Sequence, residues 1–102
     1  MRSATRKKIG KDKSYREFIL AQPCCYCEAV GIEQPDKTEG AHIGPRSYST
    51  KRPDRDMLPL CGMHHAELHA IGPVAFWREI GVTPERLIER FNEKYDGGER
   101  PA

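Results

Sequence analysis

The sequence predicts an α+β fold in which a small ββα unit is cross-linked by a metal ion and flanked by helices at both ends. All 4 cysteines and all 4 histidines lie in three short stretches, 24–27, His42 and 61–69. Two short apolar segments lead into a helical pattern at the third stretch, and amphipathic patterns lie on either side. Only 37% of the residues are hydrophobic, so we expect a metal to supplement the small core.

Length and composition indicate one domain in a reducing compartment. A chain of 102 residues has room for one hydrophobic core. No apolar stretch approaches the ~20 residues that span a bilayer, and residues 1–8 lack the apolar part of a secretory signal. We therefore expect a cytoplasmic chain with no membrane partner, in which cysteines bind metal more often than they form disulfides.

The basic residues gather in two segments. Residues 1–13 are polar and without periodicity, which predicts a disordered arm. A second basic cluster precedes Cys61 and consists of Arg46, Lys51, Arg52 and Arg55. Such segments can meet nucleic-acid phosphates, but a solvated tail and a solvated loop are equally good interpretations of either one alone.

A helix is predicted directly after the arm. Ser14 is its predicted N-cap, because Glu17 follows three residues later and completes a capping box. Pro23 ends this helix. The folded domain is expected to span 14–95, with a tail over 96–102.

Two further helices are predicted near the C-terminal end, over 73–80 and 84–95. Pro73 suits the first turn of one helix, and Thr83 is the predicted N-cap of the other. Their apolar stripes, which include Val74, are assigned to the core.

The ββα unit lies between these helices and is expected to occupy about 24–72. Residues 24–39 have no periodicity and are predicted to form a loop. Short strands are predicted at 40–43 and 57–60, and a helix from about 62 to 70.

Four residues are predicted to hold a structural Zn²⁺: Cys24, Cys27, Cys61 and His64. A gap of two residues lets both side chains of a pair converge on one ion, and the two pairs together complete a tetrahedron. Cys25 is an alternative to Cys24, although its spacing to Cys27 is less favourable.

The other histidines are candidates for catalysis. His65 and His69 are four residues apart on one helix face and can hold a second, more open metal, although an exposed polar face is the plainer interpretation. His42 alone would be an ordinary half-buried histidine. Because it precedes the basic loop and the 61–69 helix, it is a candidate general base.

Taken together, these segments resemble the HNH endonucleases, the ββα-metal or His-Me finger superfamily. The resemblance covers about residues 24–72 and is greatest for small zinc-containing phage and prophage members, including Ref-type recombination nucleases. The matching segments are Cys24-Cys25-Tyr26-Cys27, Gly40-Ala41-His42-Ile43, Asp54-Arg55-Asp56-Met57-Leu58-Pro59-Leu60-Cys61 and Gly62-Met63-His64-His65.

The resemblance implies a metal-dependent endonuclease that hydrolyses DNA phosphodiester bonds. It gives His42 the role of general base and places Asp56 at the middle Asn, which braces the loop. It assigns one catalytic ion, Mg²⁺ or Mn²⁺ with Zn²⁺ as an alternative, to His65 and His69. The basic residues that would contact phosphates are Arg46, Lys51 and Arg52. Ref-type relatives also suggest a recombination partner protein, and the oligomeric state is open.

Two positions depart from the family pattern. Many members carry Asp or His directly before the catalytic His, as a metal ligand, and this chain has Ala41 there. The catalytic ion would then depend on His65, His69, water and phosphate. Asp56 accepts hydrogen bonds but lacks the donor of the Asn that it replaces.

Two other functions account for part of the same pattern. A non-catalytic zinc-binding module that contacts DNA or protein needs only the four zinc ligands, and it leaves His42, His65 and His69 without a role. A thiol redox protein built on residues 24–27 is disfavoured, because the motif does not open a helix in a thioredoxin-like βαβ context.

Overall fold

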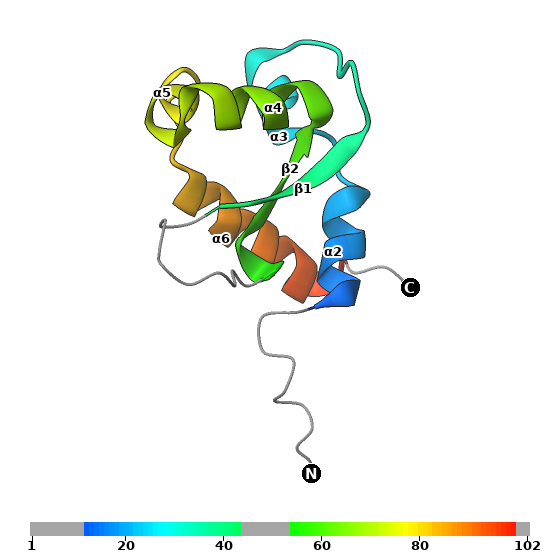
Figure 1. The fold of residues 1–102 in the computed structure, drawn as a ribbon. Helices are drawn as coiled ribbons and strands as arrows, with labels where there is room; N and C mark the ends of the chain where they lie inside the picture. Colours follow the sequence, from blue (N-terminus) through cyan, green and yellow to red (C-terminus); the bar gives the residue numbers. More distant parts are fainter. Residues whose placement is uncertain (1–11, 44–53, 100–102) are drawn as a thin grey trace.

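The fold is built around one antiparallel pair of strands. The computed structural model describes residues 12–43 and 54–99. The elements are α2 (Lys13–Leu20), α3 (Cys25–Val30), β1 (Thr38–His42), η1 (Asp54–Asp56), β2 (Met57–Cys61), α4 (Gly62–Ile71), α5 (Pro73–Arg78), α6 (Pro84–Lys94) and η2 (Tyr95–Glu99). In Figure 1, α3 and α4 lie above the strands, and α2 and α6 lie below them. The predicted α+β class and the ββα order are confirmed.

The register of the strands fixes what lies at each end of the pair. Thr38 is opposite Cys61, and His42 is opposite Met57. Gly40 lies directly against the Met57 side chain, which would have to move to make room for a Cβ at position 40. β2 is buried along its whole length, since α2, α3, α4 and α6 all contact it.

The N-cap predicted at Ser14 is wrong. Helix α2 begins at Lys13, and the Asp12 carboxylate accepts the Tyr15 N–H at 3.1 Å as the cap. Ser14 lies inside the helix, where its hydroxyl is hydrogen bonded to the Tyr95 hydroxyl at 2.7 Å. A long-range contact selects the earlier cap, because the Asp12 N–H donates to Asp54 Oδ2 at 2.8 Å. Asp12 and Lys13 therefore belong to the fold and not to the predicted arm.

The loop predicted over 24–39 contains a helix. Cys24 is the N-cap of α3, and its sulfur accepts the Cys27 N–H at 3.4 Å. Gly31 ends the helix with a φ of 75°, a left-handed conformation that favours glycine. With only 6 residues, α3 is too short to produce a helical period in the sequence.

The C-terminal elements differ from the prediction at two points. Val74, which the sequence places in the core, is 71% exposed, whereas Phe76 and Trp77 are the buried residues of α5. The predicted tail is also partly folded, because residues 95–99 form the turn η2. Its Asp96 carboxylate accepts two hydrogen bonds from the Arg55 guanidinium, at 3.2 and 3.0 Å.

Arg55 connects the two ends of the described chain. Its guanidinium lies 4.8 Å from the centre of the Tyr15 ring and 5.0 Å from that of Tyr95. It also donates to the Asn92 side chain at 2.8 Å. Cation–π contacts and a forked ion pair thus hold α2, η1 and the end of α6 together.

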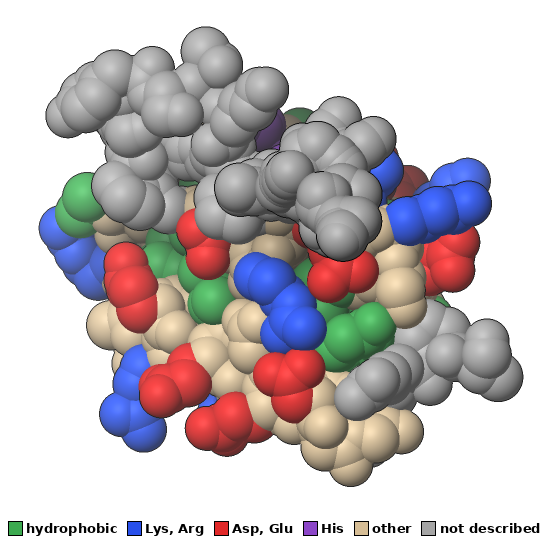
Figure 2. All heavy atoms as spheres, turned by 90° about the horizontal axis from the view of Figure 1, so that it is seen from below, with side chains coloured by type: hydrophobic (Ala, Val, Ile, Leu, Met, Phe, Trp, Pro, Cys, Tyr) green, Lys and Arg blue, Asp and Glu red, His purple; other side chains and the backbone are tan. Residues whose placement is uncertain are grey.

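Charges of both signs are mixed on the surface. On the face shown in Figure 2, the described Lys and Arg side chains alternate with Asp and Glu. The predicted phosphate contacts Arg46, Lys51 and Arg52 lie outside the described residues, as does the predicted arm over 1–11. None of the helices in the described ranges is long and apolar enough to cross a membrane.

The Asp12 cap can be tested by substitution. We expect Asp12→Ala to lower the free energy of unfolding by about 1 kcal/mol, because it leaves the Tyr15 N–H without its acceptor. Asp12→Asn is the matched control, since an amide oxygen also caps helices and should retain most of the stability. Urea unfolding followed by circular dichroism measures both variants. Equal stability of Asp12→Ala and the parent would contradict the assignment of this cap.

Candidate metal centre and histidine sites

Four ligand side chains converge where three elements meet. The ligand atoms of Cys24, Cys27, Cys61 and His64 all lie within 4.8 Å of one another, and all four residues are buried. Cys24 caps α3, Cys27 lies in its first turn, Cys61 ends β2, and His64 lies in the first turn of α4. Two local turns therefore form the two halves of the cluster.

The distances between these ligand atoms suit tetrahedral zinc. With Zn–S bonds of about 2.3 Å and a Zn–N bond of about 2.0 Å, a tetrahedron has edges of roughly 3.8 Å between sulfurs and 3.5 Å between sulfur and nitrogen. The Cys27 and Cys61 sulfurs are 3.8 Å apart. The His64 Nδ1 atom lies 3.7, 3.5 and 3.4 Å from the sulfurs of Cys24, Cys27 and Cys61. The predicted set can hold a metal ion, and its geometry is compatible with structural zinc.

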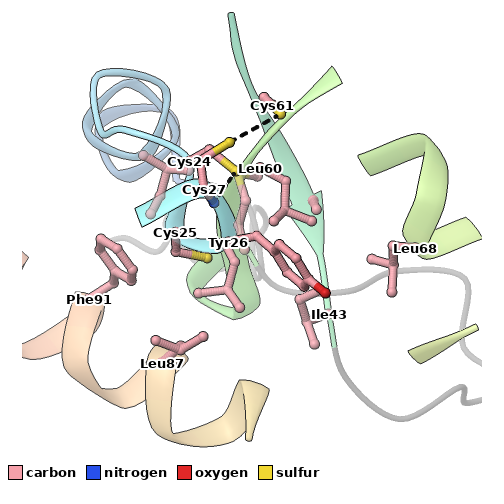
Figure 3. Close-up of a cluster of buried hydrophobic side chains, with 14 of the residues drawn as sticks. Cys24, Cys25, Tyr26, Cys27, Ile43, Leu60, Cys61, Leu68, Leu87 and Phe91 are labelled. Carbon is pink, nitrogen blue, oxygen red and sulfur yellow. Dashed lines mark hydrogen bonds between the residues drawn. The ribbon is translucent and has the colours of Figure 1, made fainter. Parts of the chain in front are cut away.

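Cys25 is not part of the cluster, which settles the alternative ligand in favour of Cys24. Figure 3 shows the sulfurs of Cys24, Cys27 and Cys61 close together and Cys25 on the side of Leu87 and Phe91. Burial raises the pKa of the Cys25 thiol to about 12. A buried, protonated thiol is a poor nucleophile, so Cys25 is a packing residue.

Aromatic rings from α3 and α5 surround the imidazole of His64. The Tyr26 ring lies 4.4 Å from the His64 ring and 4.3 Å from the Phe76 ring, between centroids. The Tyr26 hydroxyl donates to Glu79 Oε1 at 2.6 Å. Burial, together with this bond, raises the pKa of Tyr26 well above its ordinary value. The stack excludes water from one side of the cluster and fixes the orientation of the ring.

His42 is paired with a carboxylate that sequence reasoning missed. The His42 Nε2 and Asp54 Oδ1 atoms are 2.9 Å apart, and the second Asp54 oxygen accepts the Asp12 N–H at 2.8 Å. The His42 side chain is 39% exposed, whereas that of Asp54 is 9% exposed. Asp56 occupies the position of the family's Asn. Its backbone carbonyl accepts the Ile43 N–H at 2.9 Å. The turn η1 therefore brings Asp54, and not Asp56, to the histidine.

The histidine pair on α4 also has an unforeseen neighbour. Glu39 of β1 places its Oε1 atom 2.8 Å from the Nδ1 atom of His65. The rings of His65 and His69 lie 5.0 Å apart, as expected one helical turn from each other. Within the described residues, the zinc-like cluster is the only group of three or more ligands that converges fully. The Glu39 pair is therefore a looser, more open arrangement.

The two histidine sites start from different points on β1. His42 and Glu39 are three residues apart, which is about 10 Å along a strand. The predicted base and the predicted helix ligands thus contact different partners: Asp54 in one case and Glu39 in the other. Only the strand register, which the sequence leaves open, could have revealed both partners.

The assignment of the four metal ligands can be tested by substitution. We expect Cys61→Ala to lose bound zinc and the cooperative melting transition, because the remaining ligands cannot link β2 to α3. Cys25→Ala is the matched control and should keep its zinc, with a modest loss of stability from the lost packing. Atomic absorption and thermal melting, with and without a chelator, give both results. Full zinc content in Cys61→Ala would contradict the assignment.

One comparison with known proteins gives a family for this chain. Residues 1–98 match the family described as "Protein of unknown function (DUF968)". The uncharacterized protein YdfU of Escherichia coli (strain K12) is 35% identical over 94 residues, which are 92% of this chain and 25% of YdfU. The chain thus spans about a quarter of the length of this relative. No solved structure matches. Because the family match covers almost all of its length, the chain belongs to the DUF968 family of proteins of unknown function.

Proposed function

We propose that this chain is a metal-dependent endonuclease that hydrolyses DNA phosphodiester bonds, with an HNH or ββα-metal core. The observation that carries the proposal is the contact between His42 Nε2 and the buried carboxylate of Asp54 at 2.9 Å. An exposed imidazole held by a buried carboxylate at the end of a strand is typical of a catalytic base that must not rotate.

The contact with Asp54 selects one tautomer of His42. A carboxylate accepts hydrogen bonds, so Nε2 carries the hydrogen and donates a hydrogen bond to Asp54. Nδ1 then has a free lone pair. The His42 side chain is 39% exposed, so water has access to the ring. Nδ1 would take a proton from the water that attacks the phosphorus, which is general-base catalysis.

Asp54 in turn is held in place by the backbone. Its Oδ2 atom accepts the Asp12 N–H at 2.8 Å, so the carboxylate remains fixed while the imidazole gains and loses a proton. Asp54 is therefore a positioning residue in the proposed reaction, a role that the resemblance gives to Asp56.

The remaining roles follow the resemblance. His65 and His69 would hold a divalent ion, Mg²⁺ or Mn²⁺, which supplies Lewis-acid stabilisation of the phosphate and the leaving oxygen when bound. Arg46, Lys51 and Arg52 would contact neighbouring phosphates. The four-ligand cluster would keep zinc as a structural ion, with its thiolates maintained by the reducing cytoplasm of a bacterium or a phage-infected cell. A recombination partner protein belongs to the same proposal.

The role of His42 can be tested by DNA cleavage. We expect His42→Ala to reduce Mn²⁺-dependent nicking of supercoiled DNA by about 10²–10⁴-fold, because the attacking water loses its base. Zinc content should match the parent, and the protein should remain folded with a modestly lower melting temperature, because Asp54 Oδ1 loses its hydrogen-bond partner. A variant that cleaves as fast as the parent would remove His42 from the mechanism. A folded, zinc-loaded parent that cleaves neither double- nor single-stranded DNA would favour a non-catalytic module that binds DNA or protein.

Neighbouring carboxylates in η1 allow a matched test of Asp54. We expect Asp54→Asn to slow cleavage by about 10-fold or more, because an amide can donate to His42 and stabilise the tautomer with its proton on Nδ1. Asp56→Asn, which introduces the amide of the HNH pattern, should slow cleavage much less. Single-turnover rates at saturating Mn²⁺ measure the difference. A larger effect at Asp56 would return the bracing role to that residue.

A further inference from the structure

An apolar groove lies at the edge of the fold, between α5 and the start of α6. Helix α5 packs against α4 at the outer side of the domain, as Figure 1 shows. The groove has a volume of about 440 Å³, which is within the roughly 300–1,000 Å³ of pockets that hold another molecule. Most of its lining is apolar and consists of Pro73, Val74, Trp77, Val82 and Pro84.

The α5 wall of the groove is an exposed apolar surface in a chain rich in charge. Residues 70–77 contain no charged side chain, although 31% of the whole chain is charged. Within this segment Val74 is 71% exposed and Ile71 is 46% exposed. Pro73 and Ala75 beside them are exposed as well. Contiguous apolar side chains at a surface mark interaction sites, whereas single scattered ones do not. This wall is therefore suited to contact with a partner.

The groove also carries one charge of each sign, one on each wall. Arg78 is the last residue of α5, and Glu85 lies in the first turn of α6. Within residues 12–43 and 54–99, neither side chain forms an ion pair. A partner with a single sign of charge would complement one wall and meet a like charge at the other. A second copy of the same groove, turned by a two-fold rotation, can bring a cation to each anion.

We propose that this groove is the interface of a symmetric dimer. Val74 of each copy would enter the groove of the other copy, and Arg78 would face Glu85 across the interface. The contacts of a two-fold interface occur twice, so two such ion pairs would form. The groove is lined by 9 residues, fewer than the roughly 20–30 on each side of a standard interface, so we expect a weak dimer. The proposal is independent of the endonuclease assignment, because the lining includes none of the residues placed in metal binding or cleavage.

Sedimentation equilibrium tests the dimer with the full chain loaded with zinc. We expect a monomer–dimer equilibrium whose Kd lies between about 1 μM and 1 mM. Val74→Asp should raise the Kd by at least about 10-fold, because it places an unpaired carboxylate in an apolar interface. Val30→Asp is the matched control, since Val30 is 43% exposed on α3 and lies outside the groove, and it should leave the Kd unchanged. Zinc content and melting temperature show that each variant is folded.

A charge exchange tests the two-fold arrangement. Arg78→Glu alone and Glu85→Arg alone should each raise the Kd by about 10-fold or more, because like charges then face each other twice. An equimolar mixture of the two variants should associate at least as tightly as the parent. In the mixed dimer one copy carries two anions and the other carries two cations, so both pairs are restored.

Trp77 provides a local reporter for the same surface. It is the only tryptophan of the chain, so its indole N–H gives a single resonance in a ¹H–¹⁵N spectrum. We expect this resonance to shift or broaden as the parent is concentrated and to stay constant in Val74→Asp.

Three outcomes would overturn the dimer. The first is a parent that remains monomeric up to about 1 mM, which would leave the groove to a different protein segment. The second is an equal effect of Val30→Asp and Val74→Asp on the Kd. The third is a mixture of the two charge variants that stays dissociated, because a two-fold interface requires the mixture to associate.

Discussion

The convergence of three thiols and one imidazole is the constraint on which the rest of the structure depends. Cys24, Cys27, Cys61 and His64 are buried together, and their ligand atoms all lie within 4.8 Å of one another. Binding of Zn²⁺ to such a set contributes about 10–16 kcal/mol, which equals or exceeds the whole stability of an ordinary small domain, about 5–15 kcal/mol. A core with few aliphatic residues is sufficient when a metal links α3, β2 and α4.

The cluster also determines where the histidine sites lie. Because Cys61 ends β2 and His64 lies in the first turn of α4, the helix must leave the sheet at this point. Thr38 is opposite Cys61, so the next residue of β1, Glu39, meets the first turns of the helix. The far end of the same strand carries His42, which meets η1 instead. One short strand thus carries the residues that contact both Asp54 and His65.

The turn η1 supports the other end of the sheet. Asp54 connects His42 to the backbone of Asp12, and Arg55 connects Tyr15 to Asp96. The proposed base is consequently attached to the start of α2 and to the end of α6. Asp54 and Arg55 therefore link His42 to segments at both ends of the domain. These contacts explain why Asp12 and Asp96, which lie outside the predicted domain boundaries, are structured.

The sequence by itself determined the features that depend on neighbours along the chain. The two-residue gaps of the metal ligands and the Thr83-Pro84 helix start are local geometry, and both are observed as predicted. The tertiary structure alone decided the cap at Asp12 and the partners Asp54 and Glu39. These contacts join residues 42, 12 and 26 positions apart, so their formation depends on strand register and on the packing of distant elements. A carboxylate in the sequence shows that a partner is available, but only the folded backbone selects which carboxylate reaches which histidine.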